Sequence, residues 1–306
     1  MAQIRAKPVL KWAGGKSKLL SQIKPLFPPE LKQGKIKRYI EPFVGGGAVF
    51  LDIAQCYPKV EEFFILDINP ELIIAYTSIQ QEVNILIDKL TQIESNYLSF
   101  PEAQRKDYFY QIRTEFNQTR HQVNIAQYGK NWLLRTAQLI FLNKTCFNGL
   151  FRVNSKGEFN VPQGKYKNPK ICDPDNLKAV SQILQKTTLK LGDYRQCCDW
   201  VDPQTFVYFD PPYRPISKTA NFTAYSSHSF KDEEQLQLRD FFVKLDQRGA
   251  KLLLSNSDPK NEDQKDNFFD LAYEGYNVKR IKAGRSINSN ASKRGLINEV
   301  VITNYN

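Results

Sequence analysis

The sequence predicts an α/β fold in which a parallel sheet is flanked by helices and an inserted helical domain separates some of its strands. Short β-rich runs are apolar through their length instead of alternating, which is typical of strands buried on both faces. These runs are 38–43, 62–67, 205–210, 250–256 and 296–303. Helical periodicity fits 71–98, 102–124, 131–144 and 231–247, and Asp173-Pro-Asp begins a further segment that continues to 186.

The chain length of 306 residues suggests about two domains. Between Asp67 and Thr205 the patterns are helical, and we find only one strand-like stretch, FRVNSKGEFNV at 151–161. Its two short arms flank Asn-Ser-Lys-Gly and predict a β-hairpin. We therefore expect one domain formed by 1–72 and 171–306, which carries the sheet, and an inserted domain at 73–170.

Positive charge is concentrated in two parts of the chain, whose formal net charge is +11. Residues 1–40 hold ten Lys and Arg against one acid, Glu30, and residues 101–170 hold twelve against four acids. Such segregation suits a surface that binds a polyanion, although a solvated basic face without a partner has the same composition.

Other classes of protein are disfavoured by composition. No apolar run has the length of a membrane-spanning helix, and no secretory signal precedes the first strand, so we expect a cytoplasmic protein. The five cysteines are odd in number, form no C-x-x-C pair and accompany only two histidines. This predicts reduced thiols, with neither a disulfide framework nor a metal site.

The stretch LKWAGGKSKLL at 10–20 resembles a phosphate-binding loop only in part. That motif requires a glycine five residues before Gly15-Lys16-Ser17, and Leu10 stands there. A nucleotide triphosphate site is therefore disfavoured.

A second glycine segment, YIEPFVGGGAVFLDIA at 39–54, joins a strand to a helical pattern. Gly45 and Gly47 match the dinucleotide-binding fingerprint, but Phe50 replaces its third glycine. Asp67 ends the next strand, where an acid can accept hydrogen bonds from ribose hydroxyls. The segment favours an adenosine-containing cofactor without a bound pyrophosphate; a plain tight turn is the alternative.

The stretch FDPPY at 209–213 follows a buried strand. Its two prolines stiffen the loop and hold Asp210 near Tyr213. The Asp210 carboxylate and the Pro211 carbonyl can accept both N–H bonds of an exocyclic amine and so increase electron density on its nitrogen, while Tyr213 offers a stacking face. A base must leave the duplex to reach such a pocket. The alternative is a Pro-Pro turn with a capping Asp.

Several long strings in this chain, taken together, resemble the DNA adenine-N6 methyltransferases of the Dam group, in the motif order of the alpha class. They are KWAGGK (11–16), EPFVGGG (41–47), LDINPELI (66–73), FLNKTCFNGLFRVNSKGEFNVPQGKY (141–166), DPPY (210–213), TANFTAYSSHSF (219–230) and RSINSN (285–290). The resemblance covers nearly the whole chain. It implies a Rossmann-like S-adenosylmethionine-dependent methyltransferase fold with an inserted, mainly helical DNA-recognition domain that carries the hairpin.

The resemblance also implies roles for individual residues. The catalytic set is Asp210, Pro211, Pro212 and Tyr213. S-adenosylmethionine would be bound by Trp12, Ala13, Gly14, Lys16, Glu41, Pro42, Phe43, Gly45, Gly47, Asp67, Ile68 and Asp210. DNA would be recognised by Lys11, Phe147, Asn148, Leu150, Arg152, Pro162 and Tyr166.

Within the recognition set, Arg152 can bond O6 and N7 of a guanine. Phe147 stands where an aromatic side chain can wedge into the opened base stack. Many Dam proteins have Tyr at that position, and a Phe packed in the domain core is the alternative. The loop with Arg285-Ser286-Ile287-Asn288, Lys293 and Arg294 suits phosphate contacts, although for Lys293 and Arg294 a solvated loop explains the charges equally well.

These features predict a site-specific enzyme that methylates N6 of a flipped-out adenine, in double-stranded GATC. We expect a monomer, associated with the nucleoid, that needs no protein partner. Two alternatives remain. Cytosine-N4 methylation needs the same amine chemistry, although Ser commonly replaces Asp210 in that motif, and a catalytically silent DNA-binding relative would keep the fold.

Overall fold

The computed structural model describes residues 4–215, 230–284 and 296–306, and a seven-stranded sheet forms its centre. The strand order is β3-β2-β1-β4-β5-β7-β6. The first five strands in that order are parallel, and β7 runs antiparallel to both β5 and β6. The strands are β1 (Arg38–Glu41), β2 (Glu62–Asp67), β3 (Thr187–Leu191), β4 (Thr205–Phe209), β5 (Lys251–Ser257), β6 (Asn277–Gly284) and β7 (Leu296–Thr303).

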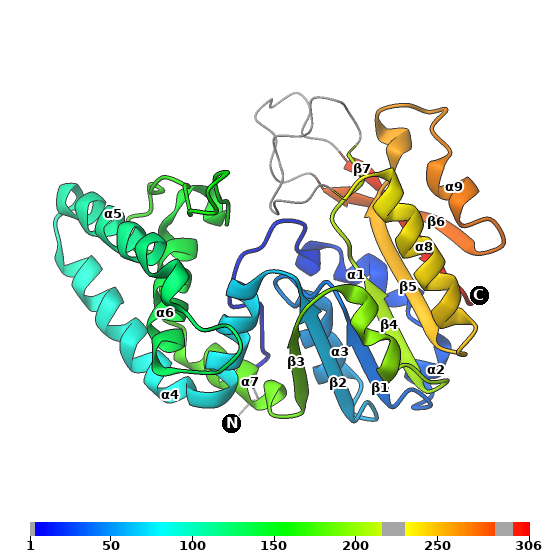
Figure 1. Ribbon diagram of the computed structural model, residues 1–306, viewed down its shortest axis with the longest axis horizontal. Coiled ribbons are helices and arrows are strands. Elements are labelled where there is room, and N and C mark those ends of the chain that lie inside the picture. The colour runs from blue at the N-terminus through cyan, green and yellow to red at the C-terminus, as the bar shows by residue number, and fades with distance from the viewer. Residues whose placement is uncertain (1–3, 216–229, 285–295) are drawn as a thin grey trace.

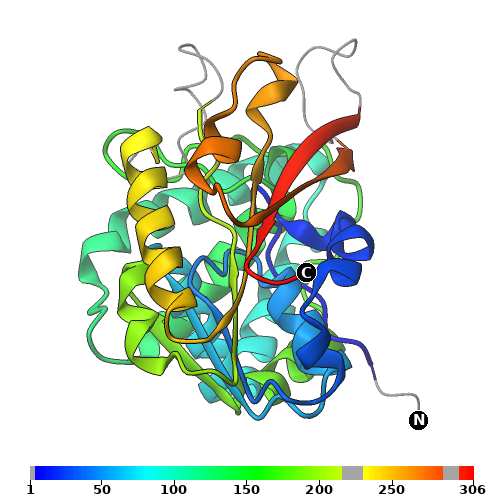
Figure 2. The same ribbon diagram turned by 90° about the vertical axis from the view of Figure 1, so that its right-hand side faces the viewer.

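Helices cover both faces of the sheet and extend beyond one edge (Figures 1 and 2). No helix among the described residues has the length and apolar character needed to cross a membrane. The helices are α1 (Leu20–Ile23), α2 (Pro29–Lys32), α3 (Ala48–Cys56), α4 (Pro70–Ser99), α5 (Glu102–Gln118), α6 (Lys130–Thr145), α7 (Pro174–Leu184), α8 (Asp232–Asp246) and α9 (Phe268–Ala272).

Alternate residues of the buried strands supply two apolar cores. On β4, Phe206 and Tyr208 face the core that includes α3, whereas Val207 and Phe209 face the core that includes α8. All five residues of this strand are buried. A strand buried on both faces has no need for polar alternation, which explains why continuous apolar runs marked the central strands.

The two edge strands, β3 and β6, were not predicted. The expectation of a single strand-like stretch between Asp67 and Thr205 is wrong, because Thr187–Leu191 forms β3 beside β2. Edge strands need not be apolar, and these two carry Lys190, Lys279 and Lys282. The run at 296–303 is a strand as predicted, but as β7 it is antiparallel to its neighbours.

Helix α4 connects the sheet to a group of helices, α4 to α6, that lies beyond β3 in Figure 1. It begins at Pro70 with Asn69 as its cap and is interrupted by non-helical dihedral angles at Glu82. Just before this kink, the side chain of Gln80 donates to the carbonyls of Leu184 and Thr187. The kink is thus fastened to the connection between α7 and β3.

A tight turn joins the two short arms of the stretch 151–161. Val153 and Phe159 form an antiparallel bridge, and Gly157 has a φ of +76°, which favours glycine. The side chain of Asn154 accepts hydrogen bonds from the backbone N–H groups of Lys156 and Glu158. Phe159 is buried, so it anchors this short pairing to the core of the helical group.

A buried ion pair joins α4 to α6. The guanidinium of Arg135 bonds the carboxylate of Glu71, with Nε to Oε2 at 2.8 Å, and also donates to the carbonyl of Phe116 at 2.9 Å. The guanidinium carbon lies 4.1 Å from the centre of the Phe116 ring. Arg135 therefore holds three helices at one point.

We predict that Arg135→Leu destabilises the protein by about 3–5 kcal/mol, since it leaves the Glu71 carboxylate buried without its partner. Urea unfolding measures the loss. The double variant Glu71→Leu/Arg135→Leu should recover most of it, because no uncompensated charge remains. A single variant as stable as the double variant would contradict this role.

Candidate active site

The glycine turn after β1 can be built only with glycines. Gly45 and Gly47 have φ angles of +48° and +71°, in the left-handed region that other residues avoid. A Cβ on Gly47 would lie 2.7 Å from the hydroxyl of Tyr76, which itself donates to the carbonyl of Gly45 at 2.9 Å. The turn therefore packs closely against Tyr76 at the carboxyl end of β1, and Gly45 and Gly46 remain half-buried there.

Asp67 ends β2 next to this turn. Its carboxylate accepts hydrogen bonds from the backbone N–H groups of Gly45 at 3.0 Å and Asn69 at 2.9 Å. Burial raises the pKa of Asp67 to about 6, against the opposing effect of these bonds. The next residue, Ile68, leaves 62% of its surface exposed. An acceptor and an apolar side chain thus stand together at this edge, as an adenosine requires.

An aromatic cluster continues this edge. The ring of Phe43 lies 5.4 Å from that of Tyr194 and 6.0 Å from that of Phe230. The backbone N–H of Gly192 donates to the carbonyl of Asp67, so the loop that follows β3 is fixed beside β2. Sequence analysis missed Tyr194 because it missed β3. Had that edge strand been predicted, the loop after it, which carries Tyr194, would have been expected at the carboxyl edge of the sheet.

Glu41 and Pro42 are buried under the turn. The hydroxyl of Tyr39 donates to the Glu41 carboxylate at 2.6 Å. Burial raises the pKa of Glu41 well above its usual value, although the hydrogen bond from Tyr39 opposes the shift. Glu41 is thus a buried acid and not a surface contact.

The first loop of the chain, with Trp12, Ala13 and Gly14, reaches the same place. A Cβ on Gly45 would lie 3.1 Å from a ring carbon of Trp12. Gly14 is exposed, and its carbonyl accepts a hydrogen bond from the ammonium of Lys16. The predicted cofactor residues of the loop and of the glycine turn therefore lie side by side.

Lys16 is buried against the segment Asp210 to Tyr213. Its Nζ donates to Oδ1 of Asp210 at 2.6 Å and to the hydroxyl of Tyr213 at 3.1 Å, and only 2% of the residue is exposed. Burial alone lowers the pKa of Lys16, but Asp210 and Tyr213 together with neighbouring acids raise it well above its usual value. Burial raises the pKa of Asp210, and Lys16 opposes that shift.

The remaining contacts hold the Asp-Pro-Pro-Tyr segment rigid. The hydroxyl of Ser255 donates to Asp210 at 3.3 Å, and the buried side chain of Gln235 donates to the carbonyl of Pro212 at 3.1 Å. Pro211 is buried and Pro212 is exposed. Beyond the segment, Arg214 pairs with two acids, Asp232 and Asp266. The carboxylate and the ring are therefore presented by a fixed loop.

Sequence analysis also missed Glu299, on β7. Its Oε1 accepts a hydrogen bond from Tyr213 at 2.6 Å, and its Oε2 lies 3.9 Å from Nζ of Lys16. Burial raises the pKa of Glu299, while Lys16 opposes the shift. Glu299 sits inside the apolar run at 296–303, so its charge was the only signal in the sequence.

Asn143, a third residue that sequence analysis missed, joins Lys11 to the predicted recognition segment. Its buried side chain accepts from the Lys11 N–H at 2.8 Å and donates to the Lys11 carbonyl at 2.9 Å and the Gly149 carbonyl at 3.1 Å. Nearby, the rings of Trp12 and Phe151 stack at 5.0 Å. The first loop therefore contacts the recognition segment as well as the glycine turn.

The predicted recognition residues are mostly accessible. Phe147 is 55% exposed, so the alternative of a Phe packed in the core is wrong. Asn148 has a φ of +58°, and the N–H of Phe147 donates to the carbonyl of Pro162. Arg152, Pro162 and Tyr166 are exposed and Leu150 is half-buried.

Some predicted elements lie outside the described residues. These are 219–229 of the string TANFTAYSSHSF, the loop Arg285-Ser286-Ile287-Asn288, and Lys293 with Arg294.

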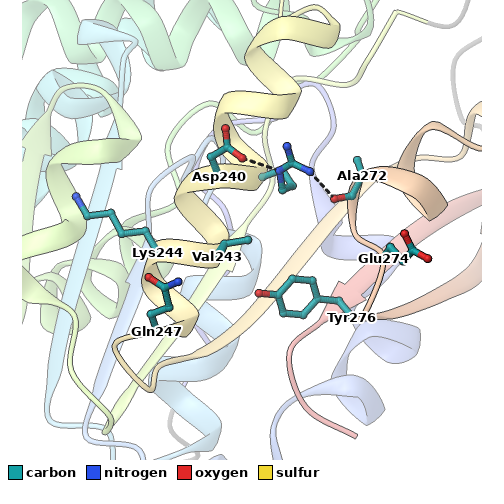
Figure 3. Close-up of a pocket in the computed structure, with 8 residues that line it drawn as sticks. Asp240, Val243, Lys244, Gln247, Ala272, Glu274 and Tyr276 are labelled. Carbon is teal, nitrogen blue, oxygen red and sulfur yellow. Dashed lines mark hydrogen bonds and ion pairs between the residues drawn. The ribbon is translucent and has the colours of Figure 1, made fainter.

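A separate groove of about 440 Å³ lies between α8 and the segment that follows α9 (Figure 3). Arg239 is among the residues that line it, and its guanidinium donates to the carboxylate of Asp240 and to the carbonyl of Ala272. None of the predicted site residues lines it. The predicted chemistry therefore belongs to the sheet edge and not to this groove.

Comparison with known proteins identifies the family of the chain. Residues 12–287 match the family model of D12 class N6 adenine-specific DNA methyltransferases. The chain is 48% identical to the type II methyltransferase M.MjaIII of Methanocaldococcus jannaschii, over 99% of this chain and 100% of the relative. It is 35% identical to the type II methyltransferase M1.LlaDCHI of Lactococcus lactis, over 99% and 97%, and 32% identical to the DNA adenine methylase of Escherichia coli, over 95% and 93%. The chain therefore belongs to the D12 class of N6 adenine-specific DNA methyltransferases.

Proposed function

We propose that this enzyme transfers a methyl group from S-adenosylmethionine to N6 of an adenine that is flipped out of a GATC site in double-stranded DNA. The observation that carries the proposal is the meeting of three features at the carboxyl edge of the sheet. These are the glycine turn with Asp67, the Asp210 to Tyr213 segment, and the loop that carries Lys11.

The residues at this edge fit S-adenosylmethionine. The turn at 45–47 has no side chains that would block the close approach of a ligand, and Asp67 offers a carboxylate to ribose hydroxyls. Ile68 and Phe43 provide apolar surface for an adenine ring. When bound, S-adenosylmethionine supplies an electrophilic methyl group on a sulfonium.

The protein's part in the chemistry is to orient the target amine and increase its electron density. In our proposal one N–H of the amine donates to the Asp210 carboxylate and the other to the Pro211 carbonyl. The Tyr213 ring stacks on the base. Among the described residues the donors to Asp210, Lys16 and Ser255, both bond Oδ1, which leaves Oδ2 for the amine. No strong base is needed, since the methylated amine loses its proton readily.

Recognition of GATC is assigned to the accessible residues of the segment 147–166 and to Lys11. Arg152 bonds the O6 and N7 atoms of a guanine, and Phe147 wedges into the base stack left by the flipped adenine. The basic character of 101–170 supports contact with DNA phosphates. We assign catalysis to 1–72 and 171–306 and recognition to 73–170.

The alternatives have less support. The family match is to adenine-specific enzymes, so cytosine-N4 methylation is not favoured. A silent DNA-binding relative would have no use for the hydrogen-bonded carboxylate of Asp210. We further propose that the enzyme acts as a monomer in the cytoplasm, on the DNA of the nucleoid.

We predict that Asp210→Asn lowers the rate of methyl transfer about 10²- to 10³-fold, because the amide lacks the negative charge that activates the amine. DNA affinity should change little. Transfer of tritiated methyl groups and gel-shift titration measure the two properties. A fully active Asp210→Asn would show that the catalytic assignment is wrong.

We predict methylation of a GATC duplex and none of a duplex with GTTC in its place, whose complementary strand still contains adenines. Arg152→Ala should reduce discrimination against altered sites by about 1–3 kcal/mol, the usual contribution of a bidentate contact to guanine.

The control is Lys156→Ala, at the exposed turn of the same hairpin. If Lys156 contacts a phosphate, its replacement should weaken binding to all DNA sequences equally and reduce the salt dependence of binding. Equal labelling of the GATC and GTTC duplexes would contradict the proposed specificity.

We predict that affinity for S-adenosylmethionine falls as the pH drops through the pKa of Asp67, about 6. Ribose hydroxyls bond the carboxylate better than the protonated acid, so affinity declines by at most about tenfold per pH unit. Calorimetric titration at pH values on both sides of the pKa measures this. Asp67→Asn should bind more weakly, and this part of the pH dependence should disappear; an unchanged dependence would contradict the role of Asp67.

A further inference from the structure

Glu299 is an ionisable residue inside the sheet. It pairs with Ser257 of β5 on one side and Ile281 of β6 on the other, and only 4% of its surface is exposed. A buried carboxylate costs several kcal/mol unless hydrogen bonds or an opposite charge compensate it. Sheet geometry does not require an acid at this position, so the pocket it faces must account for it.

Only one of the two oxygens of the Glu299 carboxylate accepts a hydrogen bond from a described residue. The hydroxyl of Tyr213 donates to Oε1 at 2.6 Å, whereas Oε2 is buried and has no hydrogen-bond partner among the described residues. The nearest cation is the ammonium of Lys16, with Nζ 3.9 Å from Oε2. That distance exceeds a hydrogen bond, and the hydroxyl of Tyr213 contacts both groups.

Lys16 has no donor left for Glu299 in this arrangement. An ammonium has three N–H bonds, and those of Lys16 go to the carbonyl of Gly14, the hydroxyl of Tyr213 and Oδ1 of Asp210. Two carboxylates, Asp210 and Glu299, therefore compete for one cation. The occupied partner is the carboxylate that the target amine must use.

We propose, on the basis of the proposed function, that Glu299 is a positioning residue that fixes the Tyr213 ring and accepts the Lys16 ammonium when the target amine engages Asp210. An ammonium bonded to Asp210 weakens that carboxylate as an acceptor for the amine. Movement of the ammonium to the vacant Oε2 of Glu299 restores the acceptor. The ammonium stays paired throughout, so the step leaves no buried charge without a partner.

A thermal unfolding cycle tests the coupling without turnover. Glu299→Gln should lower the Tm of the otherwise unchanged protein, because it removes a carboxylate that faces Lys16. In a Lys16→Met background, Glu299→Gln should leave the Tm unchanged or raise it. Without the Lys16 ammonium the carboxylates of Asp210 and Glu299 repel each other, and the substitution removes that repulsion. An equal fall in Tm in both backgrounds overturns the coupling.

Kinetics test the role in catalysis. Glu299→Gln keeps an acceptor for Tyr213 but loses the charge, and we expect kcat to fall about 10- to 100-fold, the range found for residues that orient metal ligands by hydrogen bonds. KM for the GATC duplex should change by less than about twofold, because the ground-state contacts to DNA remain. Glu299→Asp, which keeps the charge, should recover part of the loss. The matched control Glu274→Gln, at an exposed acid, should behave as wild type.

The outcomes separate this inference from the proposed function. If the wild-type protein methylates GATC and the Glu299→Gln variant has a normal kcat, the inference about Glu299 is wrong and the proposed function stands. A loss that Glu299→Asp does not relieve at all also overturns the inference, since shape and not charge would then be the cause. A wild-type protein that leaves DNA unmethylated overturns the proposed function, and the unfolding cycle still decides whether Glu299 and Lys16 are coupled.

Discussion

The ion pair between Lys16 and Asp210 is the interaction on which the arrangement of the site depends. It joins residues 194 positions apart in the sequence and fastens the first loop of the chain to the end of β4. At its other end the same loop is held at Lys11 by the side chain of Asn143. A few residues of backbone thus span the distance between the Asp-Pro-Pro-Tyr segment and the segment that we assign to DNA recognition.

Burial of acids gives this pocket its electrostatic character. Burial raises the pKa of Glu41, Asp67, Asp210 and Glu299, and the buried ammonium of Lys16 opposes the shift at Glu41, Asp210 and Glu299. Because burial disfavours the charged form of each acid, the ammonium of Lys16 is what keeps negative charge at Asp210 and Glu299 favourable. Burial of these acids costs stability, which the apolar cores on the two faces of the sheet must supply.

Sequence reasoning predicted the parts of the fold whose pattern depends on local burial. The five buried strands and the long helices follow from apolar runs and periodicity, and Asp67 and Asp210 stand at strand ends as expected. It failed at β3 and β6, because edge strands carry polar residues that resemble loops. Asn143 and Glu299 escaped notice because their partners come from distant parts of the chain, which only the folded arrangement brings together.

The contacts that hold Lys11 limit which residues near it can be replaced. A side chain on Gly149 would collide with Lys11, since its Cβ would lie 2.8 Å from the lysine Cδ, and Asn143 binds both residues. Arg152 and Pro162, by contrast, are open to solvent. Substitutions at Arg152 or Pro162 are therefore expected to leave the packing of the first loop intact, whereas a side chain at Gly149 would displace Lys11.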